Sequence, residues 1–152
     1  MPSKMISMVS AALVVATLIA PSARASDVNQ TDGLALRGFD PVAYFTQKKA
    51  VKGDPQWTVM HHDVTYEFAS QEDQTAFQAD PDKYVPQYGG FCALATSVGV
   101  KADADPKEFV VRDGKLFVNN NPKAQSLFQQ DVEGNIKKAD HNWPDVAKRP
   151  LR

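Results

Sequence analysis

The sequence contains a single cysteine, Cys92, among its 152 residues. One cysteine cannot form an internal disulfide, so the hydrophobic core must stabilise the fold without a covalent cross-link. The same scarcity excludes a C-x-x-C redox pair, a C-x-x-C-H haem attachment and a cysteine-rich zinc cage. Phosphate-binding signatures are missing as well. The chain has neither a G-x-G-x-x-G turn nor a P-loop, so nothing in it supports nucleotide binding.

The chain also lacks an excess of basic charge. Its 17 Lys and Arg residues are balanced by 18 Asp and Glu residues, for a net charge of −1. A nucleic-acid-binding protein needs a basic face, so nucleic acid is excluded as a partner. Basic residues cluster only near the end, as Lys148, Arg149 and Arg152. A short solvated tail over residues 147–152 explains this cluster better than a membrane-binding patch does.

Only the N-terminus carries a long hydrophobic run. Lys4 precedes an apolar stretch from Met5 to Ala20, and Ala23-Arg24-Ala25 has the small-x-small pattern of a signal peptidase site. The stretch is short for a membrane span, which needs roughly 20 apolar residues. We therefore predict a signal peptide over residues 1–25 and a periplasmic or secreted protein without a membrane anchor after cleavage. An uncleaved N-terminal anchor is the alternative.

The remaining length fits one domain. We predict a flexible N-terminus over residues 26–32, a folded domain over 33–146 and the basic tail over 147–152. Residues 56–69 alternate between apolar and polar side chains as paired strands do, with His62-Asp63 as the turn between them. Trp57, Val59 and His61 are expected to share one face of the first strand, and Val64, Tyr66 and Phe68 one face of the second.

A second hairpin has the stronger signal. Asp113-Gly114 lies between two β-rich runs, residues 109–112 and 115–118, and Asp-Gly in that position strongly favours a tight hairpin turn. Two hairpins separated by helical segments predict an α+β fold. We expect a small antiparallel sheet built from the two hairpins and packed with three or four short helices.

Capping residues indicate where those helices begin. Asp40 before Pro41 predicts a helical turn, and Ser70 with Asp73 three residues later is a capping box for a helix over about 71–79. Asn121-Pro122 opens another helix. We expect Gly134 to interrupt that helix, Asn135 to cap a last one and Trp143-Pro144 to end the fold. The run over residues 93–98 fits either a helix or a strand.

In combination these motifs resemble the YHS-domain family, in particular its exported single-domain branch, over nearly all of the predicted mature chain. The matching segments are 38–45 (Gly-Phe-Asp-Pro-Val-Ala-Tyr-Phe), 64–70 (Val-Thr-Tyr-Glu-Phe-Ala-Ser), Phe77, 80–84 (Asp-Pro-Asp-Lys-Tyr), 88–93 (Tyr-Gly-Gly-Phe-Cys-Ala), 113–117 (Asp-Gly-Lys-Leu-Phe), 134–136 (Gly-Asn-Ile), 139–140 (Ala-Asp) and 142–144 (Asn-Trp-Pro).

The resemblance implies a metal-handling module, because YHS domains are found beside copper and heavy-metal transporters. In the YHS domains found beside transporters, cysteines occupy the positions that correspond here to Ala43 and Ala69. The metal ligands of those domains therefore do not carry over to this chain. The ligand types that remain are Cys92, His61, His62 and His141. Thiolate and imidazole suit copper, and cysteine with histidine also suits zinc. His61 and His62 are adjacent on a predicted strand or turn, so we expect them to point to opposite faces.

Two hypotheses follow. The first is a binding protein that holds a transition metal, copper first, through Cys92 and a histidine, and that works with an unidentified protein or metal-handling partner. The second is a non-catalytic structural or interaction domain with Cys92 buried in the core. In that case the turn Tyr88-Gly89-Gly90-Phe91 would shape a partly exposed surface for a partner or small ligand. Catalysis is the weakest interpretation, because no Cys/His spacing resembles a hydrolase motif.

Overall fold

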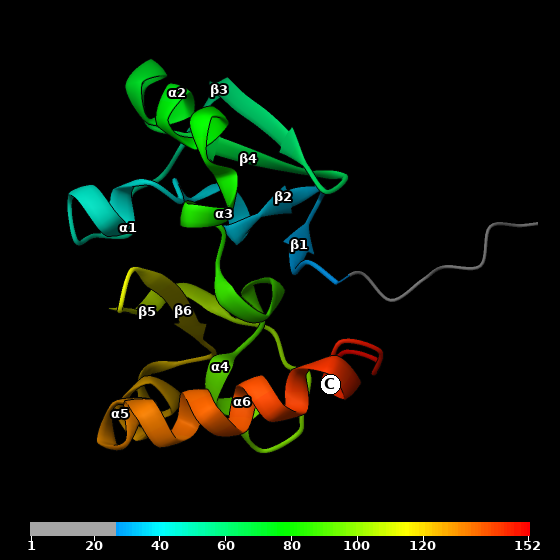
Figure 1. Ribbon diagram of the computed structural model, residues 1–152. Coiled ribbons are helices and arrows are strands. Elements are labelled where there is room, and N and C mark those ends of the chain that lie inside the picture. Colours follow the sequence, from blue (N-terminus) through cyan, green and yellow to red (C-terminus); the bar gives the residue numbers. More distant parts are fainter. Residues whose placement is uncertain (1–26) are drawn as a thin grey trace, which may run out of the picture.

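The computed structural model describes residues 27–152, so the predicted signal peptide lies outside the described residues. Figure 1 shows two halves stacked on each other, each combining strands with helices. The predicted α+β class is confirmed. None of the helices within residues 27–152 has the length and hydrophobicity needed to cross a membrane.

Six strands and six α-helices, with two short 3₁₀ turns, make up this described part of the chain. The strands are β1 (Gln30–Thr31), β2 (Leu34–Ala35), β3 (Asp54–His61), β4 (Val64–Phe68), β5 (Asp105–Arg112) and β6 (Lys115–Asn119). The helices are α1 (Ala43–Thr46), α2 (Gln71–Ala79), α3 (Pro81–Tyr84), α4 (Ala93–Ser97), α5 (Pro122–Gln130) and α6 (Val132–Val146), and the 3₁₀ turns are η1 (Leu36–Gly38) and η2 (Gln87–Gly90).

Both predicted hairpins form, but they lie in two separate sheets. The antiparallel pair β3–β4 belongs to a four-stranded sheet with the order β1-β2-β4-β3, in which β2 and β4 run parallel. The pair β5–β6 stands alone as a two-stranded sheet. The other edge of β6 is occupied by an isolated bridge between Leu116 and Pro86, the residue just ahead of η2. That bridge places η2, rather than the first sheet, beside β6.

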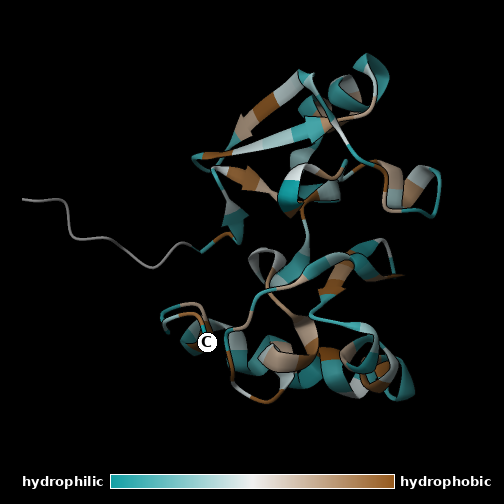
Figure 2. Ribbon diagram, turned by 180° about the vertical axis from the view of Figure 1, so that it is seen from behind, coloured by the Kyte–Doolittle hydropathy of each residue, from teal (hydrophilic) through white to brown (hydrophobic). Residues whose placement is uncertain are grey.

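The upper half is held together by an aromatic core. Val64, Tyr66 and Phe68 of β4 are buried, as their alternation predicted, and they pack with Phe77 of α2. Ser70 accepts a hydrogen bond from the backbone N–H of Asp73 at 3.1 Å, which confirms the predicted start of α2. Figure 2 shows hydrophobic colour on parts of the strands and on α4, whereas α2 is largely hydrophilic.

The lower half has its own core and is joined to the upper half by Tyr44. The rings of Phe117 and Phe128 meet at 5.8 Å between β6 and α5. Tyr44 of α1 is fully buried, donates a hydrogen bond from its hydroxyl to the carbonyl of Pro106 at 2.8 Å, and packs edge-on against Phe109. The first helix is therefore anchored to the second hairpin.

The prediction for the last helix is wrong. The helix opened by Asn121-Pro122 already ends at Gln130, so Gly134 does not interrupt it. The last helix, α6, begins at Val132, ahead of Asn135, and continues through Trp143-Pro144 to Val146. Asp131 caps the helix by accepting the Gly134 N–H at 3.0 Å. A β-carbon at position 134 would clash with the Asp131 carboxylate, so the glycine makes room for the cap.

Both predicted loose ends, as far as they are described, are held to the fold. Residues 27–32 include β1, and the Asn29 backbone N–H donates to the Gly89 carbonyl at 2.8 Å. At the other end, the Arg152 backbone N–H donates to the Lys101 carbonyl at 3.0 Å. Both ends are therefore connected to the fold, although residues 148–152 are exposed to solvent. Backbone hydrogen bonds to distant segments, which composition does not reveal, hold them in place.

Candidate functional site

The four predicted metal ligands are not brought together. Cys92 lies in the lower half as the residue before α4, and it is 1% exposed. His61 ends β3 and His62 follows in the turn, both in the upper half. His141 is exposed on α6. Within residues 27–152, Cys92 belongs to no group of three side chains able to hold a metal ion.

Cys92 has the surroundings of a structural residue. Its sulfur accepts the Ala95 N–H at 3.5 Å, as a helix N-cap does, and its thiol lies 3.8 Å from Oδ1 of Asn119. Burial raises the pKa of the Cys92 thiol, which disfavours the thiolate that copper or zinc would require. This placement matches the alternative in which Cys92 belongs to the core.

The prediction that Tyr88 and Phe91 are partly exposed is wrong. They are 6% and 4% exposed, and both rings pack against Trp143 of α6. Gly89 takes a left-handed conformation with φ 60°, and a β-carbon there would strike the backbone of Asp27. The glycines at 89 and 90 therefore let the N-terminal segment pack against the turn. That segment covers the turn, which was expected to form a partly exposed binding surface.

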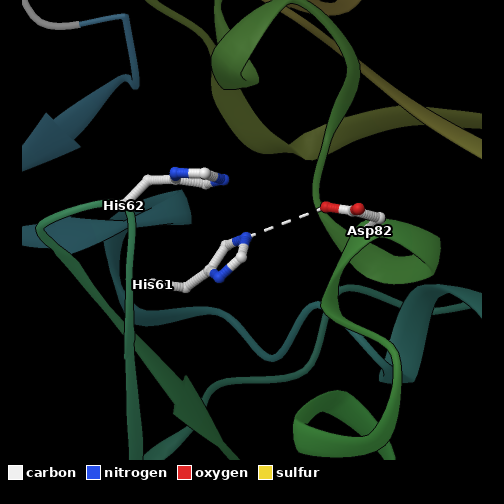
Figure 3. Close-up of side chains that lie close together, drawn as sticks. All are labelled: His61, His62 and Asp82. Atoms are coloured by element: carbon white, nitrogen blue, oxygen red, sulfur yellow. Dashed lines mark ion pairs between the residues drawn. The ribbon is translucent and has the colours of Figure 1, made fainter.

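The histidines instead meet an aspartate that the sequence did not point to. His61, His62 and Asp82 each offer one ligand atom, and these atoms all lie within 4.8 Å of one another. Figure 3 shows both imidazole rings pointing from the β3–β4 hairpin towards Asp82 at the start of α3. Nε2 of His61 and Oδ1 of Asp82 are 3.9 Å apart.

The expectation that His61 and His62 point to opposite faces is wrong. Their ring centroids are only 4.1 Å apart. His61 pairs with Val64 across a two-residue turn, and both turn residues, His62 and Asp63, have positive φ values of 50° and 61°. Strand alternation stops at His61, because the left-handed turn carries the next side chain round to the same side.

Aromatic contacts hold the ring of His61 in place. Its ring packs edge-on against Phe77 at 5.9 Å and lies 6.4 Å from the ring of Tyr66. Burial, and secondarily the neighbouring charge of His62, lower the pKa of His61, while Asp82 opposes that shift. Nε2 of His61 is buried and has no hydrogen-bond partner among the described residues. A buried ring nitrogen without a hydrogen-bond partner is costly, and a metal ion is one kind of partner that neutral imidazole accepts.

Asp82 was missed because nothing in its spacing links it to the hairpin. It lies in the first turn of α3, and its side chain is 89% exposed. As a sequence feature it is an acidic residue near a helix N-terminus, where carboxylates are common for electrostatic reasons alone. Only the return of the chain through α2 to α3 brings it beside His61.

A second titratable pair, Asp40 and Asp73, lies away from the histidines. Asp40 is fully buried, and as the predicted cap it accepts the Val42 N–H at 2.8 Å and the Ala43 N–H at 3.3 Å. Its other oxygen accepts the Ala69 N–H at 2.8 Å. Burial, then a hydrogen bond with Asp40 and the Asp40 charge, raise the pKa of Asp73 to about 6.

This pair predicts a pH-dependent contribution to stability. Because the pKa of Asp73 is raised on folding, its contribution is fully present below the ordinary value of 3.8 and is lost as pH rises through about 6. We expect the free energy of unfolding of the natural protein, relative to Asp73→Asn, to fall between pH 4 and pH 7. Denaturant titrations of both proteins at several pH values measure this difference. A flat difference would contradict the shift.

Comparison with known proteins adds no relative: no family model, curated protein or solved structure matches this chain.

Proposed function

We propose that this protein is an exported binding protein of the YHS type that holds a transition-metal ion, Cu(II) first and Zn(II) second, between His61, His62 and Asp82. The observation that carries the proposal is the buried, unpartnered Nε2 of His61 facing Oδ1 of Asp82 at 3.9 Å. Two imidazoles and one carboxylate suit these ions, and among divalent ions affinity is greatest for Cu(II).

The distances need only a small adjustment to fit an ion. Metal bonds to imidazole nitrogen and carboxylate oxygen are about 2.0–2.2 Å long, so two neighbouring ligands lie about 3.4 Å apart around tetrahedral Zn(II) and about 2.9 Å apart around square-planar Cu(II). The ligand atoms here lie within 4.8 Å of one another. His62 and Asp82 are exposed and free to rotate about their side-chain bonds, whereas His61 is held by its aromatic neighbours.

The site would leave a bound ion with an open coordination position. Three protein ligands leave at least one coordination position for water or for a ligand from a partner protein. Asp82 and His62 are exposed, so an ion held there is accessible from solvent. An accessible, incompletely filled coordination shell supports the receipt or transfer of an ion with a metal-handling partner.

The expected result is that the purified protein binds one Cu(II) ion and that His61→Ala and His62→Ala each weaken binding roughly 100-fold. Competition with a chromophoric chelator measures these affinities, and bound metal should raise the melting temperature by mass action. His141→Ala is the matched control, because it removes the remaining histidine, which is exposed on α6. It should change the affinity less than twofold.

A further variant separates this site from the one expected from sequence. Cys92→Ala should leave Cu(II) and Zn(II) affinity unchanged, because the thiol is buried in the other half of the molecule. Loss of binding in Cys92→Ala with no loss in His61→Ala would refute the His61–His62–Asp82 site. If the natural protein binds neither ion, the structural or interaction domain becomes the better interpretation.

A further inference from the structure

We infer a second binding site, for a small oxyanion-bearing molecule (a carboxylate or a phosphate), in a cavity between the C-terminal residues and the loop after α4. The cavity has a volume of about 440 Å³ and is lined by residues 98–101 on one side and by Arg149, Pro150 and Arg152 on the other. Small-molecule sites in proteins are commonly about 300–1,000 Å³. The C-terminal residues and α4 lie in the lower half of the molecule, and the β3–β4 hairpin lies in the upper half (Figure 1).

The cavity walls are fixed to each other. The Arg152 backbone N–H donates to the Lys101 carbonyl at 3.0 Å, and Nζ of Lys101 donates back to the Ala147 carbonyl at 2.9 Å. The Arg149 guanidinium also donates to the Gly99 carbonyl. In addition, the Asn142 amide of α6 donates to two carbonyls at the end of α4. Binding there needs little ordering of the chain, which reduces its entropic cost.

The cavity is lined by charged side chains of one sign, although the net charge of the chain is −1. Its lining holds three cationic side chains, Lys101, Arg149 and Arg152, and no acidic one. No ion pair joins Arg149 or Arg152 to a carboxylate of residues 27–152. Positive charge concentrated in a concave site focuses the electrostatic field and attracts anions.

Lys101 lies in the wall of the cavity, and its ammonium is buried and hydrogen-bonded to the Ala147 carbonyl. It is 3% exposed, and its Nζ lies 4.5 Å from the centre of the Phe91 ring. Burial lowers the pKa of Lys101, and the charge of Asp27 opposes that effect. An anion bound in the cavity would act on Lys101 as Asp27 does, because a nearby negative charge stabilises the protonated amine.

The arginines set the chemical class of the ligand. A guanidinium presents a planar fork of N–H donors that matches the two oxygens of a carboxylate or phosphate, and such charge-assisted pairs are strong. Two arginines with a buried lysine therefore suit a molecule with more than one negative charge. Carboxylate and phosphate share this chemistry, so the experiment compares them.

The test is titration of the protein with inorganic phosphate and, separately, with succinate at constant ionic strength, followed by amide chemical shifts in NMR spectra. We expect saturable shifts centred on residues 98–101 and 149–152. Arg152→Gln should weaken binding at least roughly tenfold, because it removes one charge. The backbone N–H of residue 152 still reaches the Lys101 carbonyl in this variant, so the wall stays in place. Whichever anion binds more tightly identifies the group.

Lys148→Gln is the matched control. It removes the same unit charge from the same tail, but Lys148 is exposed, pairs with Asp145 and does not line the cavity. Its affinity should stay within twofold of that of the natural protein. Equal losses in Lys148→Gln and Arg152→Gln would show general charge attraction and overturn the site. Absence of saturable shifts with both anions, in a protein whose spectrum shows it folded, would also overturn it.

Discussion

Replacing Asp40 with alanine is expected to lower the free energy of unfolding by about 4 kcal/mol. The carboxylate is fully buried and accepts backbone N–H groups from Val42, Ala43 and Ala69. Alanine leaves these donors without partners, and each unsatisfied buried group costs about 1–3 kcal/mol. The lost bonds also connect the start of α1 to the end of β4, so the upper half should loosen first. Denaturant unfolding at pH 7 measures the loss.

Asp131→Ala provides the control for loss of a cap without loss of a buried network. Asp131 is exposed and accepts only the Gly134 N–H at the start of α6 among the side-chain bonds of the described residues. Loss of such a cap costs about 1 kcal/mol. If Asp40→Ala were no more destabilising than Asp131→Ala, Asp40 would not have the central role that its hydrogen bonds indicate.

Phe77→Ala is expected to lower the free energy of unfolding by about 3–5 kcal/mol and, in the same protein, to raise the pKa of His61. Phe77 is fully buried, and its ring contacts Tyr66, Phe68 and the edge of His61. Removing the ring admits water beside the imidazole, and burial is the main cause of the lowered pKa of His61. Denaturant unfolding and NMR titration of the His61 ring protons measure the two effects.

Phe128→Ala is the control that distinguishes general loss of core packing from loss of the aromatic contact with His61. Phe128 is also fully buried, but it belongs to the core of the lower half, against Phe117. Its removal should cost a similar free energy and leave the titration of His61 unchanged. A shift of the His61 titration in Phe128→Ala as large as that in Phe77→Ala would mean that general loosening, and not the aromatic contact, controls the pKa.

Much of the local structure follows from the sequence alone. The alternation of residues 56–69, the Asp113-Gly114 turn and the caps Ser70 and Asn121 correctly predicted both hairpins and the starts of α2 and α5. These features depend on residues a few positions apart, so their physics is contained in short segments. The α+β class followed from their order.

The sequence also indicated which residues carry the relevant chemistry, but not their neighbours. The lone thiol and the histidines stood out by type, and the adjacency of His61 and His62 was misread because the turn reverses strand alternation. Asp82 was invisible as a ligand, because its approach to His61 depends on how α2 and α3 return the chain to the hairpin.

Tertiary structure decided everything that depends on burial and distant contact. It placed Cys92 in a core, where burial raises the pKa of the thiol. It also covered Tyr88 and Phe91 with α6 and connected the basic tail to the loop after α4 by a backbone hydrogen bond. The sequence by itself determined most of the elements and the kinds of side chain available. Which of them meet was determined by long-range packing, because the free energy of burial depends on the whole core and not on any local pattern.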